Sequence, residues 1–202
     1  AAATWAVLGP GVQADIVAEL GAPSAVEAAS LARCAALGGG MVRCGWGAVD
    51  TELALPLAGR HQLDNLQLAL ALCVQATAEG WLEALEPEVV AAAIADLRWP
   101  GRLSRHRVAG RELLVDCAHN LEGAEALAAH LAGLDHRCNL LFSCLDDKPL
   151  EAMAAVLTPL VDRVAVCELE DERAMPLARL QAAFPGARVA ATPAAALALL
   201  PE

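Results

Sequence analysis

The stretch that decides the fold is ELLVDCAHNLEGAEALAAHLAGL, residues 112–134. It opens with a short apolar run, passes through Asp116-Cys-Ala-His-Asn120, and continues with apolar residues at helical spacing. This change of hydrophobic period predicts a strand over 112–116, a polar loop, and a helix over 122–133. Open α/β sheets bind their ligands outside the carboxyl ends of their strands, which is where this polar loop would lie.

The same alternation continues to the end of the chain. Its pattern predicts strands over 138–143, 162–167 and 187–190, and helices over 149–160, 176–183 and 193–200. Strands that alternate with helices of this length favour a largely parallel sheet covered on both faces. We therefore predict an α/β, Rossmann-like C-terminal domain.

Upstream, Trp99-Pro-Gly101 predicts a hinge, which divides the chain into domains 1–98 and 99–202. The first part predicts the end of an α/β domain. Its expected elements are a strand over 4–8, a turn at 9–11, two short strands within 41–57, and helices over 12–20, 24–37, 59–80 and 87–97. The chain lacks an initial Met and opens as if inside an element, so we expect a piece of a longer protein.

Composition narrows the function classes. The chain has 202 residues and a net charge of -11, which argues against a nucleic-acid surface because such a surface needs clustered Lys and Arg. It shows no transmembrane run and no basic signal-peptide start, so we expect a soluble, cytoplasmic protein that does not bind membranes. The seven cysteines form no CxxC pair, which favours reduced, structural thiols over a disulfide or zinc site.

The loop after the first strand of the second domain carries candidate binding groups. The Asp116 carboxylate can accept hydrogen bonds from ribose hydroxyls, and His119 can reach a phosphate or a transferring group. The helix that follows attracts anions at its N-terminus. In the alternative interpretation, Asn120 only caps this helix, and Asp116 and His119 are loop polar groups.

Three other sites add polar groups. Arg102 follows Pro-Gly at the hinge and is suited to stacking on a base or forking onto a phosphate. Lys148 is the only lysine and follows a predicted strand, but it lacks the Gly-rich context of a P-loop. Polar residues stand at the start of the predicted helix 59–80, namely His61, Gln62 and Asn65. Because buried polar groups cost free energy without a partner, we expect them to cap this helix or to bind a ligand.

Four motifs in order resemble the folylpolyglutamate synthase/dihydrofolate synthase branch of the Mur ligase superfamily. They are Gly59-Arg-His61-Gln62-x-x-Asn65, Pro100-Gly-Arg102, Asp116-x-Ala-His119-Asn120 and Asp147-Lys148. The resemblance runs from about residue 55 to 200, and the first three motifs in this order are specific. Two local departures are Leu121, where the family often has Pro, and Pro149, where it has Asp.

The resemblance implies an ATP-dependent amide ligase that adds L-glutamate to dihydropteroate, tetrahydrofolate or both through an acyl phosphate. Residues 1–98 would end the central ATP-binding domain, and residues 99–202 would form most of the glutamate ligase domain. The family's P-loop and Mg²⁺ ligands would precede this chain, so no metal ligand is expected within it. Alternatives are a stand-alone nucleotide-binding module or a non-catalytic paralogue, while D-x-A-H-N disfavours a peptidoglycan-type Mur ligase.

The resemblance also assigns roles to the candidate residues. Asn65 would meet the adenine, Arg102 the phosphates and Asp116 the ribose of ATP. His119 would be catalytic, near the transferred phosphate or the incoming glutamate. The other candidate cleft residues are His61, Gln62, Asn120 and Lys148.

Overall fold

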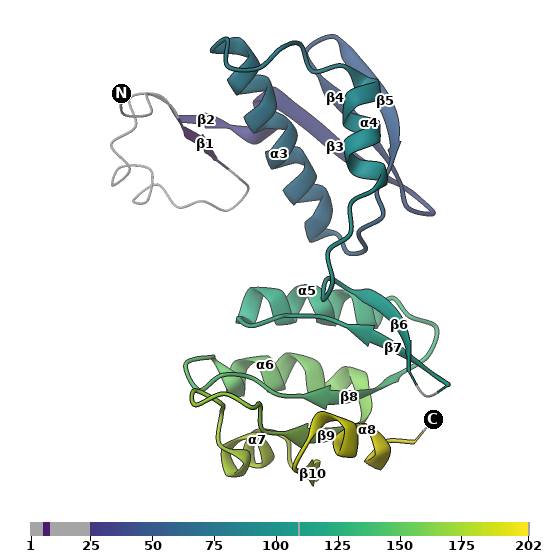
Figure 1. Cartoon of the computed structure of the whole chain (residues 1–202), viewed down its shortest axis with the longest axis vertical. Coiled ribbons are helices and arrows are strands. Elements are labelled where there is room, and N and C mark those ends of the chain that lie inside the picture. The colour runs from purple at the N-terminus through teal and green to yellow at the C-terminus, as the bar shows by residue number, and fades with distance from the viewer. Residues whose placement is uncertain (1–5, 9–24, 109, 202) are drawn as a thin grey trace. The chain divides into compact units, whose positions relative to one another are not determined.

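Figure 1 shows a computed structural model of the chain, which describes residues 6–8, 25–108 and 110–201. The chain forms two compact units, and the boundary between them follows Ser104. The sequence predicted the domain boundary after Arg98. The predicted turn at 9–11 and the predicted helix at 12–20 lie outside the described residues. We describe each unit by itself.

Two small sheets form the strands of unit 1. β1 (Ala6–Leu8) pairs in parallel with β2 (Ala25–Glu27). β3 (Ala32–Gly38), β4 (Met41–Trp46) and β5 (Val49–Ala54) form an antiparallel sheet with β4 in the centre. The last two confirm the short strands expected within 41–57.

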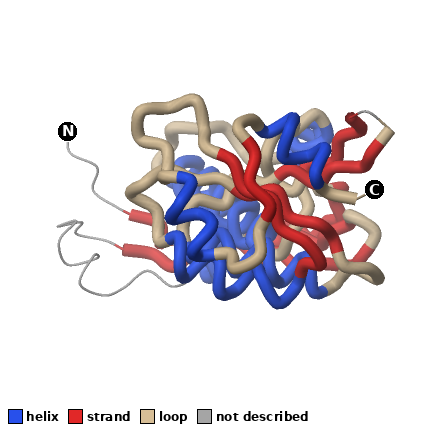
Figure 2. Tube along the Cα trace, turned by 90° about the horizontal axis from the view of Figure 1, so that it is seen from below, coloured by secondary structure: helices blue, strands red, loops and turns tan. Residues whose placement is uncertain are grey.

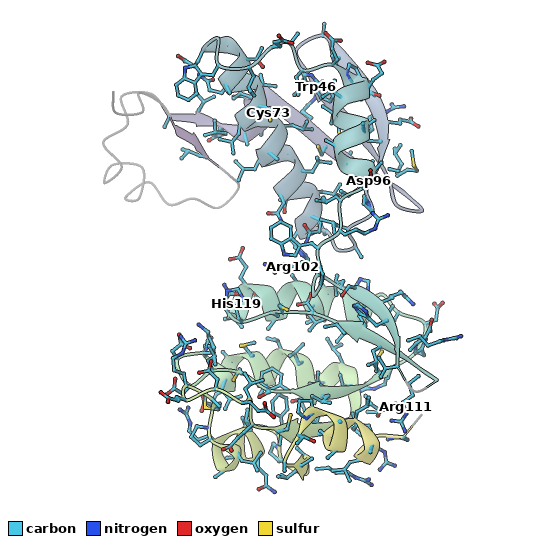
Figure 3. All side chains as sticks on the ribbon, viewed as in Figure 1. Trp46, Cys73, Asp96, Arg102, Arg111 and His119 are labelled. Atoms are coloured by element: carbon cyan, nitrogen blue, oxygen red, sulfur yellow. The ribbon has the colours of Figure 1, made fainter. Side chains whose placement is uncertain are left out.

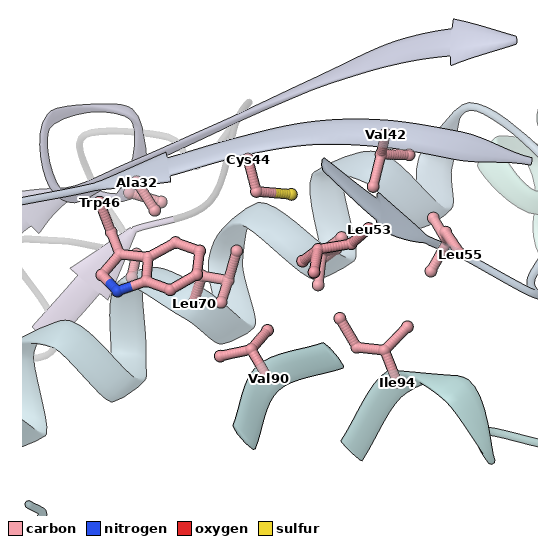
Figure 4. Close-up of a cluster of buried hydrophobic side chains, with 12 residues drawn as sticks. Ala32, Val42, Cys44, Trp46, Leu53, Leu55, Leu70, Val90 and Ile94 are labelled. Carbon is pink, nitrogen blue, oxygen red and sulfur yellow. The ribbon is translucent and has the colours of Figure 1, made fainter. Parts of the chain in front are cut away.

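Three described helices cover this antiparallel sheet: α2 (Ala28–Leu31), α3 (His61–Ala78) and α4 (Pro87–Ala95). α3 packs on β3 and β4, and α4 packs on β5. Alternate residues of β4 share one face of the sheet, so Val42, Cys44 and Trp46 all enter the core (Figure 4). There they meet apolar residues of α3 and α4, including Leu70, Val90 and Ile94.

One predicted helix of unit 1 is wrong. Residues 24–37 were expected to be helical, but only Ala28–Leu31 is, and Ala32–Gly38 is a strand. The alanines in this stretch favour a helix locally, yet pairing along the whole length of β4 overrides that preference. The predicted helices at 59–80 and 87–97 are confirmed as α3 and α4. Each observed end lies within two residues of the predicted one.

Unit 2 carries the predicted strand and helix alternation. A three-stranded parallel sheet in the order β10-β9-β8 is formed by β8 (Cys138–Phe142), β9 (Val161–Cys167) and β10 (Arg188–Ala190). β7 (Arg111–Val115) was expected to belong to this sheet. It pairs instead with β6 (Ser104–Val108), a polar strand that apolar periodicity could not reveal.

The helices of unit 2 lie on both faces of the parallel sheet, as predicted (Figures 1 and 2). They are α5 (Leu121–Ala132), α6 (Leu150–Leu157) with the 3₁₀ turn η1 (Thr158–Leu160), α7 (Leu177–Ala183) and α8 (Pro193–Leu199). Val166 of β9 packs in the core formed with α5, α6 and α7, and its neighbours Ala165 and Cys167 pack toward α8. The α/β fold class is therefore confirmed. No helix among the described residues is long and apolar enough to cross a membrane.

Candidate functional site

A glycine at the start of α3 brings two of the predicted motifs together. Gly59 has a φ of +101°, and a Cβ placed on it would lie 2.7 Å from Cε1 of His61 and 2.9 Å from Cδ1 of Leu103. Only a glycine leaves room for both side chains at this turn. The motif that contains His61 therefore packs directly against the residue that follows Arg102.

Three polar side chains of the first motif form a chain of hydrogen bonds. The Gln62 amide, only 5% exposed, donates from Nε2 to Nε2 of His61 at 2.8 Å. Nδ2 of Asn65 donates to Oε1 of Gln62 at 3.1 Å. Because His61 accepts at Nε2, its neutral ring carries the proton on Nδ1, which is buried and has no partner among the described residues.

Asn65 is the exposed end of this chain of hydrogen bonds. Its amide is oriented by Gln62, and no hydrogen bond within the described part of the chain uses its Oδ1. An amide held in this way offers one acceptor and one donor side by side. That pair matches the donor and acceptor that adenine presents along one edge.

A turn with two left-handed residues holds Arg102. Gly101 has a φ of +77° and Leu103 a φ of +48°, and Leu103 is the only non-glycine residue in the described ranges with a positive φ. A bulky side chain rarely adopts this conformation, and such strain often accompanies a functional site. Leu103 is 4% exposed, so its packing fixes the turn. The guanidinium of Arg102 has no ion pair with any described residue, which leaves it available to an anion.

The loop between β7 and α5 is locked by three short-range hydrogen bonds. Asp116 Oδ1 accepts from Ala118 N at 2.8 Å, and His119 Nδ1 donates to the carbonyl of Cys117 at 3.1 Å. Asn120 Oδ1 accepts from Gly123 N at 2.8 Å, as an N-cap. Since His119 donates through Nδ1, its neutral ring presents Nε2 as an acceptor on an exposed side chain (Figure 3). A carboxylate and an imidazole are thus held at the positive end of α5.

Asn120 therefore has the capping role that the sequence left open as an alternative. We expect Asn120→Ala to destabilise unit 2 by about 1 kcal/mol, because one amide of α5 loses its acceptor. Asn120→Asp should keep the stability, since Asp caps equally well. Amide hydrogen exchange in α5 measures the difference. Thr192→Ala, which removes the corresponding cap of α8, is the matched control and should leave exchange in α5 unchanged.

Lys148 lies in the loop that follows β8. Its Nζ donates to Asp147 Oδ2 at 2.8 Å, and this contact holds the pKa of Asp147 below its usual value. The helices α5 and α6 pack against each other, and β8 returns between them, so both helices start at the same end of unit 2. The loops that carry His119 and Lys148 therefore lie at one end of this unit.

The sequence did not single out Leu103 or Gly123, although both residues shape the candidate site. Leu103 packs at Gly59, and a Cβ on Gly123 would lie 3.0 Å from Asn120 Oδ1 and 3.3 Å from Ala118. A glycine in the first turn of a predicted helix was the available signal, because it costs stability unless a close contact requires it. No comparable signal marked Leu103, whose conformation depends on packing.

A pocket of about 800 Å³ lies beside the first motif in unit 1. Its walls are parts of β3 and β4, the segment after β5 and the start of α3; they include Cys34, Met41, Leu57, Gly59, Arg60 and Asp64. No group of three His, Cys, Asp or Glu residues in the described ranges could hold a metal ion.

Residues 101–200 match the family described as Mur ligase, glutamate ligase domain. A curated relative, the dihydrofolate synthase/folylpolyglutamate synthase of Mycobacterium tuberculosis (strain ATCC 25618 / H37Rv), is 37% identical over 155 residues. This match covers 74% of the chain and 31% of the relative.

Solved structures agree with this match. The folylpolyglutamate synthase of M. tuberculosis complexed with ADP superposes with a TM-score of 0.79 at 31% identity, covering 97% of this chain and 47% of that one. The bifunctional folylpolyglutamate synthase/dihydrofolate synthase of Yersinia pestis complexed with AMPPNP and Mn ion has a TM-score of 0.75 at 24% identity, with coverages of 96% and 46%. The second likeness supports the fold alone. The chain spans about half the length of these solved relatives.

Proposed function

The chain belongs to the folylpolyglutamate synthase/dihydrofolate synthase branch of the Mur ligase family, and on this basis we propose that it is part of an ATP-dependent amide ligase. The ligase adds L-glutamate to dihydropteroate, tetrahydrofolate or both. Residues 1–98 form the C-terminal part of its central ATP-binding domain, and residues 99–202 form most of its glutamate ligase domain. The observation that carries the proposal is the locked loop of residues 116–120 at the start of α5.

Three residues, each taken within its own unit, carry chemistry that suits one part of a nucleotide. The oriented amide of Asn65 suits an adenine edge, and the guanidinium of Arg102, which has no ion pair with a described residue, suits a phosphate. The half-buried carboxylate of Asp116, fixed through its Oδ1, suits ribose hydroxyls. We propose Mg²⁺ as the metal ion that accompanies ATP in the intact protein, with the nucleotide phosphates among its ligands.

The chemistry assigns distinct tasks to these side chains. ATP activates the substrate carboxylate as an acyl phosphate, and the amino group of glutamate attacks it, releasing phosphate. Arg102 offsets negative charge on the transferred phosphoryl group. His119 Nε2 lies exposed beside the head of α5, where it can accept a proton from the incoming amine or donate to the phosphate once protonated. Asn120 and Gln62 hold the neighbouring groups in position.

A ligation assay on the intact protein tests this proposal. With ATP, Mg²⁺ and radiolabelled L-glutamate, we expect labelled product and inorganic phosphate in equal amounts when dihydropteroate or tetrahydrofolate is added. The 202-residue chain alone should show little or no ATP hydrolysis. Nucleotide binding by the intact protein without any ligation, for either acceptor, would contradict the proposal and favour a non-catalytic binding module.

A further inference from the structure

Two thiols face each other across the antiparallel sheet of unit 1. Cys34 of β3 and Cys44 of β4 are direct partners in the strand register. Their sulfur atoms are 3.1 Å apart. Among the described cysteines this is the only pair whose sulfur atoms lie within hydrogen-bonding distance.

The backbone already has the spacing that a disulfide needs. Residues directly opposite in an antiparallel ladder have Cα atoms about 4.5 to 5.5 Å apart. Disulfides span Cα separations of about 4.4 to 6.8 Å, so no strand has to move. The two sulfur atoms would have to approach by about 1 Å to reach bonding distance.

An oxidant can reach one of the two sulfurs. Cys34 is half-buried and lines the pocket beside α3, whereas Cys44 is fully buried in the core. The hydrogen bond between them lowers the pKa of Cys44 and raises that of Cys34. Peroxide therefore reaches the Cys34 sulfur first, while the buried Cys44, the more easily deprotonated of the two thiols, is suited to act as the resolving thiolate.

We propose that Cys34 and Cys44 form a reversible disulfide when the protein meets a peroxide. The Cys34 sulfur attacks one oxygen of hydrogen peroxide, the O–O bond breaks, the thiol proton passes to the departing hydroxide, and a sulfenic acid and water form. The Cys44 sulfur then attacks the Cys34 sulfur, the S–O bond breaks, and a second water leaves. In total two thiols lose two hydrogens, and one peroxide is reduced to two waters.

The bridge would change the wall of the pocket. It links β3 to β4 covalently, several residues away from the glycine turn that joins the two strands, Gly38, Gly39 and Gly40. It also moves the Cys34 sulfur toward the buried Cys44. The same pocket is lined by Gly59, Arg60 and Asp64 from the start of α3. Oxidation therefore rigidifies the sheet that faces the first polar motif. This inference does not depend on the proposed ligase activity.

Peptide mapping of the 202-residue chain tests the proposal, because trypsin cuts after Arg33, Arg43 and Arg60 and so places the two cysteines on different peptides. The exposed Cys117 is first replaced by Ser to prevent bridges between molecules. After brief peroxide treatment and alkylation, we expect peptides 34–43 and 44–60 to be joined, with a mass about 2 Da below the sum of the reduced pair. Dithiothreitol should separate them.

A second readout follows from the cross-link. All four tryptophans precede Arg105, where unit 2 begins, so their fluorescence reports the melting of unit 1. The oxidised chain should melt at least about 4 °C above the reduced one. Cys34→Ser and, separately, Cys44→Ala should abolish both the joined peptide and the shift. Sulfinic or sulfonic acid at Cys34 without the joined peptide, or a bridge to a different cysteine, would overturn the proposal.

Discussion

Replacing His119 with Ala in the intact protein is expected to slow the proposed glutamate ligation by about 100-fold or more, the usual contribution of a positioned acid or base. The side chain is exposed, and its hydrogen bond among the described residues is to the Cys117 carbonyl, so its removal should leave the fold intact. Initial rates with saturating ATP and glutamate measure the loss. Circular dichroism checks that the variant is folded.

The matched control is His136→Ala. His136 is also an exposed histidine of unit 2, but it lies in the turn after α5, at the opposite end of that helix from His119. Turnover of this variant should equal that of the parent. Normal turnover in both His119→Ala and Asp116→Ala would remove the basis for the site described here.

Replacing Gly59 with Ala is expected to destabilise unit 1 by about 3 kcal/mol. Roughly 1 to 2 kcal/mol comes from a side chain at a left-handed φ, and about 1 to 3 kcal/mol from overlap in a packed site. The new methyl group would fall less than 3.0 Å from both His61 and Leu103, so neither can stay in place. Urea unfolding followed by tryptophan fluorescence measures the loss, since every tryptophan precedes Arg105, where unit 2 begins.

Gly80→Ala separates the two causes. Gly80 lies just after the end of α3, as Gly59 lies just before its start. It has a φ of +74°, but nothing lies within 4 Å of a Cβ added to it. We expect a loss of only about 1 to 2 kcal/mol there, from backbone strain alone. Equal losses at the two glycines would mean that the contact of Gly59 with His61 and Leu103 contributes nothing.

The accuracy of the sequence predictions differs between the two units. In unit 2 the predicted helices begin and end within three residues of α5, α6, α7 and α8, because each helix buries one regular apolar stripe. In unit 1 the helix predicted over 24–37 failed, since an alanine-rich stretch carries no signal of the partner strand that Ala32–Gly38 finds in β4. Long-range pairing is decided by residues far along the chain.

By itself, the sequence determined the alternating α/β order of the C-terminal unit and the polar residues that end its first strand. Both follow from local periodicity, which is written into adjacent residues. Tertiary structure alone decided that Leu103 would pack on Gly59 and join the motifs of His61 and Arg102. It also decided that Cys34 would face Cys44 and that β7 would pair with β6. These contacts join segments that only packing brings together, so no local pattern could reveal them.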